Sequence, residues 1–246
     1  MEKIQLKILR QEVPASKPYW DEFEVEYIDG MNVISCLMAI QRNPVNKKGE
    51  QVKPVVWECN CLEEVCGACS MNINGGPRQA CSALVANLSQ PITLKPLTKF
   101  AVVRDLMVDR QVMFDAFRHV KAWTPIDGTY GLGAGPKVAP EEQERNYLFS
   151  RCMVCGCCME SCPQYNSHSA FIGPAPLGQA SLFNNNGSGK LNKTQRLRAV
   201  TGSGGVQDCG NAQNCVKVCP KEIPLTDAIA DLGREATKLL IKDIFG

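Results

Sequence analysis

The sequence lacks the features that several common classes of protein require. No apolar run approaches the ~20 residues of a membrane-spanning helix, so we expect any contact with a membrane to come through another subunit. The opening stretch, MEKIQLKILR, has frequent charges and no apolar core, which argues against a secretory signal. A net charge of only +2 does not favour a nucleic-acid partner. The two histidines, His119 and His168, have no third metal ligand nearby in the sequence, and we expect them to be structural or solvated.

Cysteine, in contrast, is abundant, with 14 residues in a chain of 246. In a chain without an export signal these thiols are expected to stay reduced, so their density indicates metal sites rather than disulfides. Cys36 stands alone, and the other cysteines fall into three groups: Cys59, Cys61, Cys66, Cys69 and Cys81; Cys152, Cys155, Cys157, Cys158 and Cys162; and Cys209, Cys215 and Cys219.

The first group has the spacing of a plant-type [2Fe–2S] site. Cys61, Cys66 and Cys69 form a C-x4-C-x2-C pattern, and the following segment returns a fourth thiolate at Cys81. Gly67 and its small neighbours suit a loop whose backbone N–H groups approach sulfur closely. A structural zinc site fits poorly, because zinc ligands usually come as C-x2-C pairs on separate knuckles. We therefore predict that these four cysteines bind a [2Fe–2S] cluster.

The second and third groups are arranged like the two motifs of a two-cluster bacterial ferredoxin. The second group is a complete C-x2-C-x2-C-x3-C-P run that ends at Pro163. In such proteins the first three cysteines of one motif share a cluster with the last cysteine of the other motif. We therefore expect a [4Fe–4S] cluster on Cys152, Cys155, Cys158 and Cys219.

The third group lacks one ligand. In the run CGNAQNCVKVCP the second motif position is Ala212, and alanine cannot ligate iron. The remaining thiolates of Cys162, Cys209 and Cys215 then suit a [3Fe–4S] cluster. A [4Fe–4S] cluster with water or hydroxide at the open iron is the alternative.

Patterning around the first group predicts a ferredoxin-like β-grasp. Alternating apolar residues at 4–8 and 23–27 indicate strands with one buried face. A short helix is expected to begin after Asn32 and to stop at Asn43-Pro44. Residues 70–85 are expected to form a hairpin after the cluster loop.

The rest of the chain has a helical pattern. Apolar residues from Val103 to Phe117 are broadly at helical spacing, and residues 141–151 open with acidic side chains and end in arginine. The G-x-G-x-G run at 131–135 follows no strand, and we expect a loop there rather than a nucleotide site. The sequence thus predicts an α+β protein, with a plant-type ferredoxin β-grasp domain at 1–100 and an all-α, bacterial-ferredoxin-like domain at 101–246.

Three cysteines fall outside the ligand spacing. Cys59 and Cys157 are close to predicted ligands, and Cys36 is on the face of a predicted helix. Because free cysteine behaves as a small hydrophobic residue when buried, we expect all three to be buried thiols rather than ligands.

The order of the motifs resembles the iron–sulfur subunit of succinate dehydrogenase and of fumarate reductase. The similarity runs along nearly the whole chain and includes NPVNKKGE, CLEEVCGACSMNINGGPRQAC, VVRDLMVDR, KAWTPIDGTYGLGAGP, FIGPAPLGQASLFN and DCGNAQNCVKVCPKEIPLTDAIA. Eleven cysteines match the family's ligand pattern, and the family also lacks cysteine at the position of Ala212. These stretches look most like the bacterial succinate dehydrogenases that reduce menaquinone through a single dihaem cytochrome b anchor.

The resemblance implies a function in electron transfer. A flavoprotein subunit would oxidise succinate to fumarate at its FAD and would hold the dicarboxylate site. Electrons would then pass through the [2Fe–2S], [4Fe–4S] and [3Fe–4S] clusters to menaquinone in a membrane anchor that carries haem b. The complex would lie at the cytoplasmic face of the bacterial cell membrane. The alternative is the same subunit of a quinol:fumarate reductase, which runs in the opposite direction.

The resemblance also implies that the residues after Cys162 help to line the quinone pocket. These residues begin with Pro163 and Gln164. Ubiquinone-reducing relatives typically carry a tryptophan in this segment, and this chain has none there. Some relatives have histidine at the position of Gly210. Both differences favour a menaquinone-type site, and the alternative is that Gln164 and Tyr165 simply cap the chain after Pro163.

Overall fold

The computed structural model of the protein describes residues 3–125 and 137–245. The chain forms two compact units. The first contains the residues up to Arg110 together with Met153–Glu160, and the second contains Gln111–Cys152 together with the residues from Ser161 onward. The G-x-G-x-G run predicted to be a loop lies outside the described residues.

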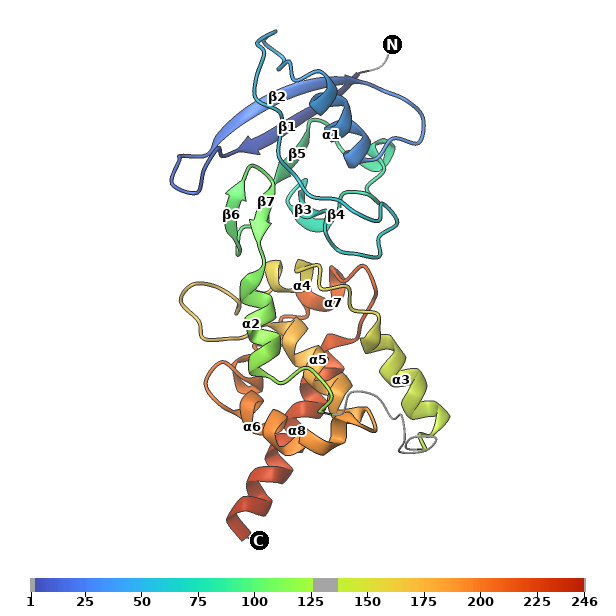
Figure 1. Ribbon diagram of the computed structural model, residues 1–246, viewed down its shortest axis with the longest axis vertical. Coiled ribbons are helices and arrows are strands. Elements are labelled where there is room, and N and C mark those ends of the chain that lie inside the picture. The colour runs from blue at the N-terminus through green and yellow to red at the C-terminus, as the bar shows by residue number, and fades with distance from the viewer. Residues whose placement is uncertain (1–2, 126–136, 246) are drawn as a thin grey trace. The chain divides into compact units, whose positions relative to one another are not determined.

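The first unit is built on a five-stranded mixed sheet with the strand order β2-β1-β5-β3-β4 (Figure 1). The strands are β1 (Lys3–Arg10), β2 (Tyr19–Glu26), β3 (Ser70–Ile73), β4 (Gly76–Gln79) and β5 (Ile92–Lys95). β1 is antiparallel to β2 and parallel to β5, and β3 is antiparallel to β4 and to β5. The predicted alternation is confirmed, because Ile4, Leu6 and Ile8 on β1 and Phe23 on β2 are buried.

Helix α1 (Val33–Arg42) contributes to the same core and begins where the sequence predicts. The Asn32 side chain accepts a hydrogen bond from the Ser35 N–H at 2.9 Å, as the N-cap of a capping box. The helix ends before Asn43-Pro44, as predicted. Cys36 lies on its buried face, where burial raises the pKa of the thiol to about 11. The prediction of a buried thiol is confirmed at this position.

The hairpin after the cysteine loop is shorter than predicted. β3 pairs with β4 as expected, but β4 ends at Gln79 and the chain leaves the sheet before Cys81. The prediction had the second strand at 79–85, but residues 80–84 are irregular and a short 3-10 helix, Val85–Asn87, follows them.

The segment after residue 100 differs more from its prediction. β6 (Ala101–Arg104) and β7 (Met107–Asp109) form a second, two-stranded sheet, and helix α2 (Gln111–His119) begins only after them. The prediction of helix is therefore wrong from Val103 to Asp109. The chain reverses at Asp105, whose φ is +47°, and the contacts that fix this turn come from residues distant in sequence.

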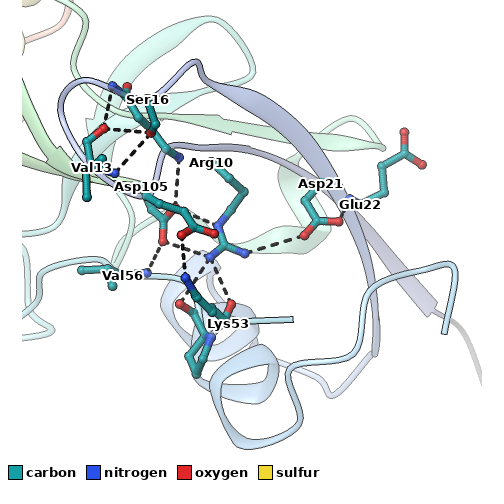
Figure 2. Close-up of polar contacts among 11 residues, drawn as sticks. Arg10, Val13, Ser16, Asp21, Glu22, Lys53, Val56 and Asp105 are labelled. Atoms are coloured by element: carbon teal, nitrogen blue, oxygen red, sulfur yellow. Dashed lines mark hydrogen bonds and ion pairs between the residues drawn. The ribbon is translucent and has the colours of Figure 1, made fainter. Parts of the chain in front are cut away.

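A buried ion pair holds that turn in place (Figure 2). Arg10 is 1% exposed and Asp105 is 0% exposed. Arg10 donates from Nε to Asp105 Oδ1 at 2.9 Å and from Nη2 to Oδ2 at 3.1 Å. The same carboxylate accepts the backbone N–H groups of Gln11 at 3.1 Å and Val56 at 2.9 Å. The pair thus joins the end of β1 to the hairpin turn and to the chain that enters the cysteine loop.

The second unit is helical, and in Figure 1 α5 and α8 run through its centre. Besides α2, its helices are α3 (Pro140–Ser150), α5 (Pro174–Asn185), α6 (Lys193–Thr201), α7 (Asn214–Lys217) and α8 (Leu225–Phe245). α8 packs against both α5 and α6. The hydrophobic core of the second unit contains residues from several of these helices and from the segments between them: Val120, Phe171, Leu177, Ala180, Leu197, Val200, Ile229 and Leu232.

Helix α3 matches its prediction, with Glu141 and Glu142 in the first turn and Arg151 as the C-cap. Within the parts of the chain that the structure describes, no helix has both the length and the apolar character needed to cross a membrane.

Candidate functional site

The first cysteine group is held by a loop and a hairpin. Cys61 and Cys66 lie in an irregular loop and are partly exposed, whereas Cys69 and Cys81 flank the β3–β4 hairpin and are buried. Partial burial and the thiols of Cys66, Cys81 and Cys61 raise the pKa of Cys59. Cys59 itself is exposed, so the prediction that it is buried is wrong; it lies in irregular chain.

Backbone N–H groups of the loop point at its sulfur atoms. Cys61 Sγ accepts from the N–H groups of Glu63 at 3.4 Å and of Val65 and Cys66 at 3.3 Å each. Cys66 Sγ accepts from the N–H groups of Cys61 and Ala68 at 3.5 Å each. The hydrogen bonds from Glu63, Val65 and Cys66 lower the pKa of the Cys61 thiol to about 7. Donors that favour the thiolate are suited to iron–sulfur ligands, so the loop fits a cluster.

The loop also packs closely on the segment Met153–Glu160, which belongs to the same unit. Gly67 has a φ of +72°, and a Cβ at this position would lie 2.6 Å from the backbone oxygen of Met153 and 2.9 Å from Cβ of Cys155. Only glycine avoids both the backbone strain and the clash. Arg110 fixes the same turn by donating to Gly67 O at 3.1 Å.

The segment Met153–Glu160 brings two predicted [4Fe–4S] ligands into the first unit. Cys155 is partly exposed, and Cys158 is buried in the short helix α4 (Cys157–Glu160). A side-chain hydrogen bond from Cys157 lowers the pKa of Cys155 to about 7. Cys157 is fully buried, as predicted. Its pKa is raised by the hydrogen bond to Cys155 and by burial, so it remains a protonated thiol.

Glu160 anchors this segment, and sequence reasoning missed it. Its side chain is buried, and Oε1 accepts from Asn72 Nδ2 at 2.8 Å, from the Thr98 N–H at 2.9 Å and from Thr98 Oγ1 at 2.7 Å. Oε2 accepts from the Lys99 N–H at 3.0 Å. A charged residue between two cysteines of a buried motif is the one signal in the sequence that marks it, because buried carboxylates need such partners.

The other two predicted [4Fe–4S] ligands, Cys152 and Cys219, belong to the second unit, and both are partly exposed. Cys219 Sγ accepts a hydrogen bond from the Ile223 N–H at 3.5 Å. A backbone donor at this sulfur again suits a ligand that carries negative charge.

The three predicted [3Fe–4S] ligands lie around one small cavity of the second unit. Cys162, Cys209 and Cys215 all line it, and Ala212 forms part of its wall. Burial and, to a smaller extent, the neighbouring Cys162 raise the pKa of Cys215 to about 11. The chain curls around this cavity with positive φ at Asn211, 51°, and at Gln213, 61°.

Gln164 lines the same cavity, and its side chain lies over Gly210. A Cβ on Gly210 would come within 2.6 Å of Gln164 Nε2. Pro163 also lines the cavity and is exposed. His119 and His168 are both exposed, which agrees with their prediction as structural or solvated residues.

Among the described residues, no three histidine, cysteine, aspartate or glutamate side chains are close enough to hold one metal ion. A structural zinc site would draw four ligands around a single ion.

Two family comparisons agree with the cysteine motifs. Residues 5–115 match the family described as a 2Fe-2S iron-sulfur cluster binding domain. Residues 149–223 match the family described as a 4Fe-4S dicluster domain.

Individual relatives extend this similarity to nearly the whole chain. The succinate dehydrogenase iron-sulfur subunit of Bacillus subtilis is 55% identical over 243 residues, which cover 99% of this chain and 96% of that protein. The fumarate reductase iron-sulfur subunit of Haemophilus influenzae is 26% identical, over 90% of this chain and 88% of that protein.

A solved structure shows the same fold. A chain in the Mycobacterium smegmatis Sdh1 complex in the apo form superposes with a TM-score of 0.78 at 22% identity, over 96% of both chains. Together with the two family matches, this confirms the predicted α+β class, with an N-terminal sheet domain and a C-terminal helical domain.

Proposed function

Because the chain belongs to the family of succinate dehydrogenase iron–sulfur subunits, we propose how its residues carry out electron transfer in that complex. The chain is the iron–sulfur electron-transfer subunit of an oxidoreductase complex. The complex also contains a flavoprotein and a membrane anchor. When bound, the clusters accept and release single electrons, and the work of the chain is to hold them and to set their surroundings.

We assign the eleven ligands by spacing and by their surroundings. The sets are Cys61, Cys66, Cys69 and Cys81 for [2Fe–2S]; Cys152, Cys155, Cys158 and Cys219 for [4Fe–4S]; and Cys162, Cys209 and Cys215 for [3Fe–4S]. The observation that carries the assignment is the cavity lined by the last three cysteines, which has Ala212 where a fourth ligand would stand.

Iron and sulfide analysis tests this assignment. The three clusters require about nine irons and about ten inorganic sulfides per chain. Stoichiometric zinc, or about ten irons per chain from two complete [4Fe–4S] clusters, would contradict it.

For the electron acceptor we propose menaquinone, held where the anchor meets the region of Pro163 and Gln164. Gln164 lies at the cavity of the proposed [3Fe–4S] ligands and occupies the space over Gly210. Its amide can donate a hydrogen bond to a quinone carbonyl. The anchor would hold haem b, the flavoprotein would hold FAD, and the complex would face the cytoplasm.

The experiment compares two activities of the purified complex. Succinate should reduce an artificial dye and also a naphthoquinone. Gln164→Ala should impair naphthoquinone reduction and leave dye reduction intact, whereas His168→Ala, an exposed residue of the same segment, should leave both intact. If Gln164→Ala changes neither activity, the residues that bind the quinone all belong to the anchor subunit.

The reverse reaction, quinol:fumarate reduction, is the second candidate. The 55% identity to a succinate dehydrogenase subunit, against 26% to a fumarate reductase subunit, favours succinate oxidation. A complex that reduced fumarate with menaquinol faster than it oxidised succinate would reverse this assignment.

A further inference from the structure

Gln79, the last residue of β4, lies between the first two cysteine groups inside the first unit. Its side chain is fully buried. Its Oε1 accepts from Cys69 Sγ at 3.5 Å, while Nε2 donates to Ser70 Oγ at 2.8 Å and to Cys157 Sγ at 3.6 Å. One amide therefore contacts a proposed [2Fe–2S] ligand and the thiol that lies between the proposed [4Fe–4S] ligands Cys155 and Cys158.

A buried amide at this place needs a reason. Burying an amide costs free energy unless its donors and acceptor are paired, and an apolar side chain of the same length would fill the space without that cost. The partners of Gln79 are two sulfur atoms and one hydroxyl rather than the usual backbone groups. Because two of these three partners are sulfur atoms of the cysteine groups, the contacts indicate a function in the redox centre.

We propose that Gln79 is a positioning residue that sets the reduction potential of the [2Fe–2S] centre through a hydrogen bond to Cys69. The proposal rests on the ligand assignment made above. It concerns a side chain that no cysteine motif identifies.

Ligation by iron defines the direction of this hydrogen bond. Binding removes the thiol proton of Cys69, so the sulfur can then only accept. The amide group has nearly the same shape after a half-turn about its last bond. Nε2 then donates to Cys69, and Oε1 faces the hydroxyl of Ser70. That hydroxyl donates to Gly67 O at 2.8 Å, and it can turn its proton to Oε1 because Gly67 O also accepts from Arg110.

The same hydrogen bond affects the redox equilibrium. One-electron reduction breaks no bond and takes no proton from the amide, but it increases the negative charge on the cluster and its sulfur ligands. A donor at Cys69 therefore stabilises the reduced form more than the oxidised form, and removing the donor should lower the potential.

The test is Gln79→Met in the assembled complex, with the [2Fe–2S] EPR signal titrated against potential. Methionine has a similar length and shape but no N–H donor. We expect the reduction equilibrium to shift about tenfold toward the oxidised form, which corresponds to about 59 mV for a one-electron couple. Gln5→Met, the same substitution at an exposed residue of β1, should leave the titration unchanged. A Gln79→Met complex that titrates like the wild type, with all three EPR signals present, would overturn the proposal.

Two further readouts keep the result unambiguous. If Gln79→Met does not assemble, Ser70→Ala removes a hydrogen-bond partner of the Gln79 amide without changing a ligand, and it should give a smaller shift of the same sign. No shift in Ser70→Ala would then overturn the proposal. Absence of a [2Fe–2S] signal from the wild type would contradict the ligand assignment instead, which separates the two failures.

Discussion

Replacing Glu160 by glutamine should loosen the segment that carries Cys155 and Cys158 from the rest of the first unit. The buried carboxylate accepts three hydrogen bonds at Oε1, from Asn72 and Thr98, and one at Oε2, from Lys99. A glutamine amide has only one accepting oxygen. In either orientation, the NH2 group of the glutamine would therefore face at least one of the N–H groups that now donate to Glu160, and two donors would oppose each other.

The size of the effect follows from these four contacts. With the amide oxygen toward Asn72 and Thr98, three hydrogen bonds remain but become neutral, and the Lys99 N–H loses its partner. A hydrogen bond to a charged group contributes about 1.5–3 kcal/mol and a neutral one about 0.5–1.5 kcal/mol, while an unpaired buried donor costs about 1–3 kcal/mol. Since such terms are not fully additive, we expect a loss of about 3–5 kcal/mol, a large part of the ~5–15 kcal/mol stability of a typical domain.

Hydrogen–deuterium exchange of the assembled complex measures this loss locally. Peptides that cover residues 153–160 and 96–100 should exchange about 100- to 4,000-fold faster in Glu160→Gln, because each 1.4 kcal/mol is about tenfold in an opening equilibrium. Glu144→Gln, at an exposed position of α3, is the matched control and should exchange like the wild type. Unchanged exchange of both peptides in Glu160→Gln would refute the view that this carboxylate holds the cysteine segment.

Other predictions concern the ion pair and the ligands. Asp105→Asn should leave the buried Arg10 without its closest counter-ion and lower the free energy of unfolding by about 3–5 kcal/mol; an unchanged melting temperature would contradict this. Ala212→Cys should convert at least part of the [3Fe–4S] cluster to [4Fe–4S] and lower its reduction potential. An unchanged [3Fe–4S] EPR signal would mean that backbone geometry, rather than the missing thiol, prevents a fourth iron from binding. Cys66→Ser should damage the [2Fe–2S] signal selectively, while Cys59→Ser should leave all three signals present; loss of a cluster in Cys59→Ser would show that the ligand register is wrong.

The features that the sequence predicts well are those that depend on local spacing. The capping box at Asn32 and the stop at Asn43-Pro44 involve neighbouring residues, so the ends of α1 follow directly from the pattern. The grouping of Cys162, Cys209 and Cys215 around one cavity follows from motif spacing in the same way, although two distant segments supply them.

The features that the sequence does not reveal depend on single contacts between distant residues. The Arg10–Asp105 pair spans 95 positions and turns an apparently helical stretch into the β6–β7 hairpin. The hydrogen bond from Asn72 to Glu160 spans 88 positions, and no local pattern marks Asn72 as the partner of this carboxylate. Gln79 is one of four residues in a short strand, and only its buried position between two sulfur atoms distinguishes it.

The central claim is that this chain carries electrons derived from succinate through its clusters. EPR spectroscopy of the purified complex, before and after anaerobic addition of succinate, tests it most directly. The oxidised complex should show a [3Fe–4S] signal that succinate diminishes, and a [2Fe–2S] signal should appear as that centre is reduced. Spectra that succinate leaves unchanged, in a complex whose clusters a strong chemical reductant does reduce, would contradict the claim.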